Sequence, residues 1–116
     1  MTVIMKTIFE KIIAREVPAK IEYEDDACIA FYDIHPQAPI NLLIVPKKVI
    51  HRLDQMEASD AENIGYLLYI AKLLAHRLGL ADGFRVVINN GRDAGETVPH
   101  LHVHLLGGRP MMWPPG

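Results

Sequence analysis

Three histidines occupy alternate positions in the segment TVPHLHVHLLGG, residues 97–108: His100, His102 and His104. Successive side chains of an extended strand point to opposite faces, so the three imidazoles would share one side of the chain. Cα atoms on the same side are then about 6.5–7 Å apart, which lets the ring nitrogens converge on one ligand. The spacing therefore suits a metal ion or a phosphoryl group.

Two other interpretations of the histidines stay open. They can decorate a solvent-facing sheet surface, although imidazole changes charge near neutral pH and its nitrogens need hydrogen-bond partners. They can also bind a catalytic zinc ion, with a third ligand from His35, His51 or His76. The sequence has a single cysteine, Cys28, and no HExxH segment, so zinc has no support beyond the alternation itself.

A phosphoryl site needs a nucleophile, an oriented imidazole and donors for the phosphate oxygens. The segment GRDAGETV, residues 91–98, comes directly before the first histidine. Its glycines let backbone N–H groups approach an anion closely, Thr97 adds a hydroxyl, and Asn89 or Asn90 adds an amide. Because such a loop also fits a plain turn between strands, its position beside the histidines is what favours phosphate.

The surrounding sequence predicts the element order α-β-β-β-α-β-β, with the histidine segment as the last strand. Two helices are expected, over residues 7–16 and 59–78, the first ending before Val17-Pro18. Because they do not alternate regularly with the strands, we expect one α+β domain over residues 1–116, with a largely antiparallel sheet. The predicted strands cover residues 20–25, 28–34, 41–46, 84–88 and 100–107.

The second helix has the clearest limits. Ser59 and Glu62 fit the capping box, in which each side chain binds the other's backbone N–H, and Gly79 is a natural stop. Its apolar residues form one wide stripe that the sheet should cover completely. The members of that stripe are Ile64, Leu67, Leu68, Ala71, Leu74, Ala75 and Leu78.

Charge and composition exclude several classes of partner. The formal net charge is −2, and without a run of basic residues we expect no nucleic acid and no membrane as a partner. No apolar run reaches the roughly 18 residues that cross a bilayer. A lone Cys28 and an N-terminal stretch without a leader-like apolar core favour a cytoplasmic protein.

The segment HLHVHLL, residues 100–106, fits the pattern H-x-H-x-H, and the chain resembles the Hint branch of the histidine triad (HIT) family. Similar segments run in order along nearly the whole chain: TIFEKII, PAKIEYEDD, AFYDIHPQAP, LLIVPKK, INNG and LLGGRPMMWPPG. The resemblance implies a five-stranded antiparallel sheet with two helices, and a homodimer whose sheets join side by side. In the sequence itself, only the apolar run 84–88 supports a dimer.

The same resemblance implies hydrolysis of purine nucleoside 5′-monophosphoramidates, without a cofactor. A purine nucleotide of the AMP or GMP type would be the ligand. His102 would attack phosphorus and form a nucleotidyl-histidine intermediate that water then hydrolyses. His100 would orient the nucleophile through its backbone carbonyl, and His104 would face the phosphate or the leaving group.

Five further residues carry over to nucleotide binding. Asn89, Gly95 and Thr97 fall where the family holds the phosphate oxygens. Asp33 falls where an acid accepts the two ribose hydroxyls, and Ile34 would lie against the base.

The chain departs from the family pattern at two positions. Asn41 stands where many relatives have a fourth histidine, and an amide cannot carry a proton although it can still form hydrogen bonds. Pro99 replaces an aromatic residue that is often found before the triad, and it favours an extended entry to the strand. Asn41 leaves open an alternative function, a nucleotide-binding or partner-binding module with vestigial hydrolysis.

Overall fold

The computed structural model describes residues 6–116. Residues 1–5 begin the stretch in which no leader segment is expected, and they lie outside the described residues. The helices are α1 (Ile8–Ile13) and α2 (Ala61–Arg77), with 3₁₀ turns at Leu53–Gln55, Ala58–Asp60 and Arg92–Ala94. The strands are β1 (Ile21–Glu24), β2 (Cys28–Tyr32), β3 (Ile40–Pro46), β4 (Phe84–Val87) and β5 (Val103–Gly107).

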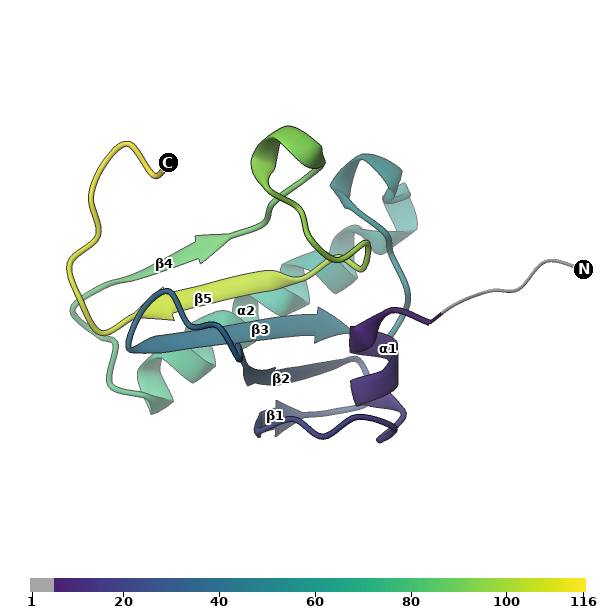
Figure 1. Ribbon diagram of the computed structural model, residues 1–116, viewed down its shortest axis with the longest axis horizontal. Coiled ribbons are helices and arrows are strands. Elements are labelled where there is room, and N and C mark those ends of the chain that lie inside the picture. The colour runs from purple at the N-terminus through teal and green to yellow at the C-terminus, as the bar shows by residue number, and fades with distance from the viewer. Residues whose placement is uncertain (1–5) are drawn as a thin grey trace, which may run out of the picture.

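The strands form one sheet in the order β1-β2-β3-β5-β4, and each neighbouring pair is antiparallel (Figure 1). The predicted α+β fold, with five antiparallel strands and two helices, is therefore confirmed. β3 lies at the centre of the sheet and is buried along nearly its whole length, as its apolar sequence predicts. In the described part of the chain, no helix is long and apolar enough to cross a membrane.

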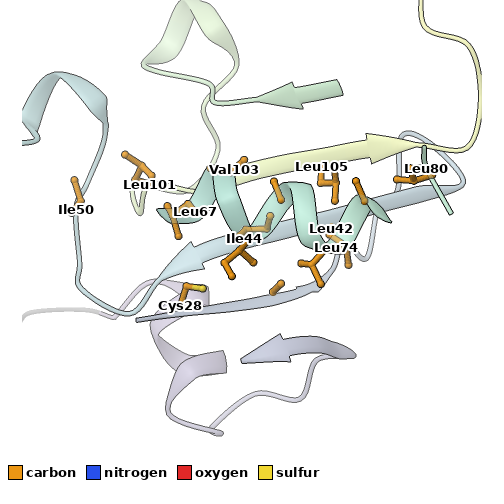
Figure 2. Close-up of a cluster of buried hydrophobic side chains, with 14 residues drawn as sticks. Cys28, Leu42, Ile44, Ile50, Leu67, Leu74, Leu80, Leu101, Val103 and Leu105 are labelled. Atoms are coloured by element: carbon orange, nitrogen blue, oxygen red, sulfur yellow. The ribbon is translucent and has the colours of Figure 1, made fainter. Parts of the chain in front are cut away.

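The two helices cover opposite faces of the sheet. Figure 2 shows the larger core, in which side chains of α2 pack against Leu42, Ile44 and Leu105 of the central strands. A smaller core lies on the other face, where Phe9 and Ile12 of α1 meet the β2 and β3 side chains that point away from α2. Successive side chains of β3 and β5 therefore point to opposite faces of the sheet, one covered by α2 and the other on the side of α1.

Two predictions about α2 are wrong in detail. Ser59 does not cap the helix, because residues 58–60 already form a 3₁₀ turn, in which the Glu57 N–H donates to the Asp60 carboxylate at 2.9 Å. Leu68 is 44% exposed, whereas Ile70, left out of the predicted stripe, is buried. The predicted stop is confirmed: Gly79 has φ +77°, a conformation that glycine adopts without a steric penalty.

Capping boxes form at two places other than the one predicted: between Glu57 and Asp60 in the 3₁₀ turn before α2, and at the start of α1. The Thr7 hydroxyl accepts the Glu10 N–H at 3.2 Å, and the Glu10 carboxylate accepts the Thr7 N–H at 3.1 Å. α1 is shorter than predicted and ends at Ile13. The next turn has Arg15 at φ +62°, which breaks the helix before the proline that was expected to end it.

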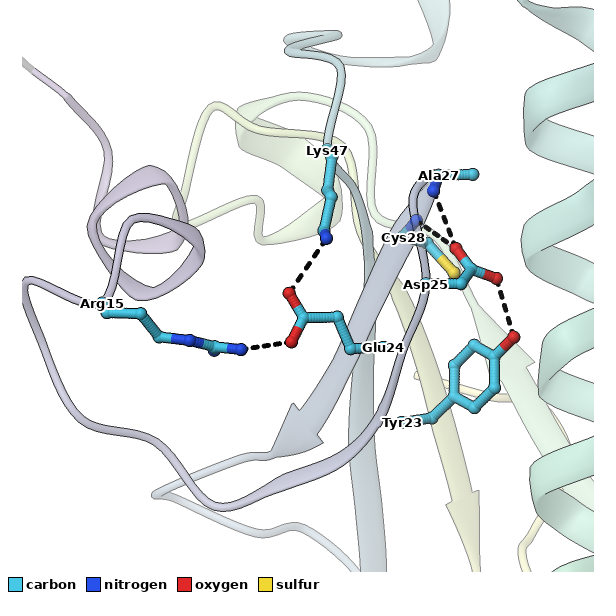
Figure 3. Close-up of polar contacts among 7 residues, drawn as sticks. All are labelled: Arg15, Tyr23, Glu24, Asp25, Ala27, Cys28 and Lys47. Atoms are coloured by element: carbon cyan, nitrogen blue, oxygen red, sulfur yellow. Dashed lines mark hydrogen bonds and ion pairs between the residues drawn. The ribbon is translucent and has the colours of Figure 1, made fainter.

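The turn between β1 and β2 is held by acidic residues (Figure 3). Asp25 accepts the backbone N–H groups of Ala27 and Cys28, each at 2.8 Å, and the Tyr23 hydroxyl at 2.7 Å. Tyr66 of α2 donates to the same carboxylate, so this turn is attached to the helix. The predicted hairpin therefore forms around an anchored acidic residue.

Candidate active site

The histidine segment is a strand only in its second half. β5 begins at Val103, so the prediction of a strand from residue 100 is wrong for His100 and His102. The predicted alternation nevertheless holds, because Leu101 and Val103 enter the core beneath α2 while the histidines lie on the other side.

The late start of β5 follows from Pro99, which has no N–H to donate to a sheet. The His100 N–H donates instead to the Val98 carbonyl at 2.9 Å, a three-residue turn that suits the fixed φ of proline. The chain therefore bends at Pro99, contrary to the predicted extended entry. The Pro99 carbonyl faces His51 Nδ1 at 2.9 Å.

The imidazole rings form an edge-to-face row with Phe9 of α1. The centroids of His102 and His104 are 5.0 Å apart, and that of Phe9 is 4.9 Å from His102 and 5.9 Å from His100. Edge-to-face packing of this kind holds each ring in one plane. Phe9 therefore belongs to the site, although sequence analysis placed it only in the first helix.

His102 has a defined tautomer. Its Nδ1 lies 2.7 Å from the backbone carbonyl oxygen of His100, which can only accept a hydrogen bond, so we assign the proton to Nδ1. Nε2 then carries the lone pair. His102 is 6% exposed, and when its ring is neutral the oriented lone pair on Nε2 can act as a nucleophile.

His100 is fully buried and held at both ring nitrogens. Its Nε2 lies 2.9 Å from the Pro46 carbonyl oxygen, which assigns a proton to that nitrogen, and its Nδ1 lies 3.4 Å from the Thr7 hydroxyl. Burial lowers the pKa of His100, against the smaller opposing effects of the Pro46 carbonyl and Glu10. His100 is therefore a neutral structural element of the site.

His104 is the most open of the three histidines and pairs across the sheet with Leu43 of β3 and Val87 of β4. Burial, followed by the neighbouring His102, lowers the pKa of His104, while the charge of Asp33 acts in the opposite direction. The pKa of His104 therefore depends on the charges around the ring, including that of a ligand bound beside it.

The glycine-containing loop before the triad folds around the 3₁₀ turn Arg92–Ala94. Gly91 and Gly95 both have positive φ, +86° and +82°, which explains why glycine is needed at these two positions. The Glu96 N–H closes the loop on the Gly91 carbonyl at 3.1 Å. Gly95 and Thr97 lie exposed on this loop, where a ligand can reach them.

A half-buried ion pair, in which the Arg52 side chain is 32% exposed, supports that loop. Arg52 contacts Glu96 at 2.8 Å, and the Glu96 side chain is only 9% exposed. Glu96 also accepts the Gly91 N–H at 3.4 Å, and Asn90 accepts the Asp54 N–H at 3.2 Å. Sequence analysis missed this support because the two ion-pair partners are far apart in the chain and form no local motif.

The loop after β2 carries the predicted ribose and base residues. The Asp33 N–H donates to the Asn41 carbonyl at 2.9 Å, and the Gln37 N–H donates to the Asn41 side-chain oxygen at 3.1 Å. Asn41 is 2% exposed, and within residues 6–116 its amide nitrogen has no hydrogen-bond partner. Ile34 is 84% exposed, so an apolar ligand can cover it.

The remaining predicted donors are placed at the end of β4. Asn89 follows Val87, the last residue of β4 and the strand partner of His104, by two residues. Asn90 uses its side-chain oxygen to hold the backbone of Asp54, so it serves the loop structure. Of the two asparagines, Asn89 remains the candidate phosphate donor.

The candidate zinc ligands are dispersed. His51 touches the histidine segment through Pro99, whereas His76 lies on α2, beneath the opposite face of the sheet, and His35 is exposed in the loop after β2. Among residues 6–116, no group of three or more histidine, cysteine or acidic residues is arranged to hold a metal ion.

Known proteins with similar sequences match this chain along nearly its whole length. A family model for the HIT domain matches residues 14–111. An uncharacterized HIT-like protein of Synechocystis is 56% identical over 95% of this chain and 96% of its own length. A 14 kDa zinc-binding protein of Zea mays is 53% identical over 95% of this chain and 88% of its own length.

Solved structures agree with these relatives. A HIT family hydrolase from Legionella pneumophila superimposes with a TM-score of 0.93 and 46% identity, covering 96% of this chain and all of its own. A histidine triad nucleotide-binding protein from Candida albicans has a TM-score of 0.80 and 31% identity, covering 94% of this chain and 83% of its own.

Proposed function

Because this chain belongs to the HIT domain family, we propose that it hydrolyses the P–N bond of purine nucleoside 5′-monophosphoramidates. The names of two similar structures, a hydrolase and a nucleotide-binding protein, support the reaction type and the ligand class. The observation that carries the proposal is the 2.7 Å contact between His102 Nδ1 and the His100 carbonyl. It leaves a lone pair on a buried imidazole next to the glycine-containing loop, residues 91–98.

In the first step, His102 Nε2 attacks the phosphorus atom, and the bond from phosphorus to the amine nitrogen breaks. The electron pair of that bond goes to nitrogen, which takes a proton and leaves as the amine. The His100 carbonyl oxygen, which accepts the Nδ1–H of His102, stabilises the positive charge that develops on the ring. The product of this step is a nucleotidyl-histidine.

In the second step, water attacks phosphorus, the bond to His102 Nε2 breaks, and a nucleoside 5′-monophosphate is released. His104 is placed to exchange protons with the leaving amine or with the water. The pKa of His104 is lowered, which favours the neutral ring, but an anionic phosphate beside it would favour the protonated form. Substrate binding would therefore raise the pKa of His104, so that its ring holds the proton that the leaving amine takes up.

The nucleotide would lie across the two loops that flank the triad. Backbone groups around Gly95, the Thr97 hydroxyl and the Asn89 amide would contact the phosphate oxygens. Asp33 would accept the ribose hydroxyls, and Ile34 would cover one face of the base. The exposure of Gly95, Thr97 and Ile34 is consistent with these roles.

A homodimer is the second part of the proposal. β4 is an edge strand, and in the described part of the chain it pairs only with β5, so its outer edge is free to pair with another strand. Phe84 and Val86 are 41% and 37% exposed, and Leu68 and Leu73 of α2 are 44% and 41% exposed. The expectation that the sheet covers the whole apolar surface of α2 is therefore wrong, and the excess favours a partner subunit.

Hydrolysis of adenosine 5′-phosphoramidate by the intact protein and by His102→Ala tests the function. We expect turnover that chelator does not affect and that disappears in the variant, with nucleotide binding retained. Binding without any turnover in the intact protein would favour the binding-module alternative. Stoichiometric zinc together with activity lost to chelator would favour a zinc hydrolase, the class to which the name of the maize relative draws attention.

A further inference from the structure

We propose that Thr7, the N-cap residue of α1, is a positioning residue for the nucleophile and acts through His100. The effect of Thr7 on catalysis rests on the proposed function. The orientation of the histidine rings, which Thr7 controls, can be measured in the protein without a ligand. The inference comes from three contacts: the Thr7 hydroxyl with the His100 ring, the His100 ring with the Pro46 carbonyl, and the His100 carbonyl with the His102 ring.

The first contact gives the Thr7 hydroxyl two roles. Its oxygen accepts the Glu10 N–H at 3.2 Å as the cap of α1, so its own proton is free to be donated elsewhere. His100 Nδ1 lies 3.4 Å away. Because His100 Nε2 carries the proton that the Pro46 carbonyl accepts, Nδ1 has a lone pair, and the hydroxyl donates to it.

The second contact explains why this donor matters. His100 is fully buried, so no solvent replaces a lost partner, and an unpaired nitrogen there is costly. Without Thr7, the Pro46 carbonyl and the edge of Phe9 still restrain the ring, but its Nδ1 has lost its hydrogen-bond partner. The hydroxyl supplies the second fixed point.

The third contact transmits the orientation to the nucleophile. The His100 carbonyl accepts the Nδ1–H of His102 at 2.7 Å, and this peptide directly follows the turn at Pro99. Movement of the His100 ring and its backbone lengthens that bond and lets His102 populate the tautomer with its proton on Nε2. In that tautomer, the nitrogen that faces the substrate has no lone pair.

Three variants separate positioning from helix capping. Thr7→Val keeps the shape of the side chain but loses both roles of the hydroxyl, and Thr7→Ser restores them. Glu10→Ala removes the other half of the capping box, the 3.1 Å bond to the Thr7 N–H, and leaves the hydroxyl facing His100. Both Thr7→Val and Glu10→Ala should weaken α1, which carries Phe9 of the site, but only Thr7→Val removes the hydrogen bond to His100.

The primary measurement is the ¹⁵N chemical shift of the imidazole nitrogens in the unliganded protein, with kcat and KM for the phosphoramidate measured in parallel. In Thr7→Val we expect the His102 shifts to move toward the average of two tautomers, and kcat to fall about five-fold at unchanged KM. Thr7→Ser should keep the wild-type shifts and kcat, and Glu10→Ala should change both much less than Thr7→Val does.

Unchanged imidazole ¹⁵N shifts in Thr7→Val would overturn the positioning role of Thr7. Changes in Glu10→Ala as large as those in Thr7→Val would overturn it as well. A wild-type protein without turnover would contradict the proposed function instead. In that case the nitrogen shifts alone would still decide whether Thr7 positions His102.

Discussion

The side-chain oxygen of Asn41 accepts the backbone N–H of Gln37 at 3.1 Å, which ties the loop after β2 to the interior of the sheet. Asn41→Ala removes this acceptor, so we expect the free energy of unfolding to fall by about 1–2 kcal/mol. Nucleotide affinity should fall as well, because Asp33 and Ile34 belong to the same loop. Urea denaturation and nucleotide titration measure the two effects.

The matched control for Asn41 is Gln37→Ala, which removes the Gln37 side chain and its 3.0 Å bond to the His35 carbonyl but keeps the backbone N–H. It should bind nucleotide nearly as well as the wild-type protein. Equal losses of affinity in both variants would show that the loop does not depend on Asn41.

Arg52 should matter for substrate binding through the glycine-containing loop. Arg52→Met leaves the Glu96 carboxylate, 9% exposed, without its cation, and the loop that Glu96 holds at Gly91 should loosen. We expect KM for the phosphoramidate to rise roughly five-fold while kcat changes little. Arg92→Met is the control, since the Arg92 side chain is 93% exposed and, among residues 6–116, its one ion pair is with the neighbouring Asp93. An unchanged KM in Arg52→Met would contradict the role of the ion pair.

Stability should decrease as pH falls through the range where free histidine titrates. Burial lowers the pKa of both His100 and His104, so below about pH 6.5 the unfolded chain binds more protons than the native protein. The free energy of unfolding is therefore highest above that pH and falls below it. Urea unfolding at about pH 7.5 and about pH 5.5 measures the difference. His100→Gln should reduce this difference in unfolding free energy between the two pH values. The same difference in His100→Gln as in the wild-type protein would show that His100 is not one of the histidines responsible.

Asp25 should stabilise the fold without affecting the reaction. Burial alone would raise its pKa, but hydrogen bonds from Tyr66, Tyr23 and two backbone N–H groups outweigh that effect and hold the pKa far below its usual value. Its contribution is thus present at neutral pH and lost in acid below about pH 4. Asp25→Asn should cost about 2–3 kcal/mol of unfolding free energy at pH 7 with kcat unchanged. Asp26→Asn, at the exposed neighbouring position, should cost almost nothing.

The two edge strands offer a matched test of the dimer. Val86 of β4 and Ile21 of β1 are each 37% exposed, and they lie at opposite edges of the sheet. The wild-type protein should sediment at about twice the 13.0 kDa of one chain. Val86→Lys should produce monomers, because it places a charge on the free edge of β4, whereas Ile21→Lys should remain dimeric. Monomers in both variants would place the interface elsewhere.

Local patterns predicted the elements and the α+β class, but not the order of the strands in the sheet. Helical spacing predicted both helices, β-rich and apolar runs predicted the five strands, and Gly79 predicted the end of α2, since these features depend on neighbours within a few residues. The capping signal shows the limit of such patterns. Thr7 and Ser59 both precede a glutamate by three residues, yet only Thr7 forms a capping box, because the chain before Ser59 already turns.

The sequence by itself determined the identity and alternation of the site residues: three histidines on one side of a chain whose other side is apolar. Tertiary structure decided which of them has a free lone pair. That depends on the carbonyls of His100 and Pro46 and on the Thr7 hydroxyl, which come from three separate segments. A hydrogen bond needs its donor and acceptor at a defined distance, and only the folded chain brings these segments together.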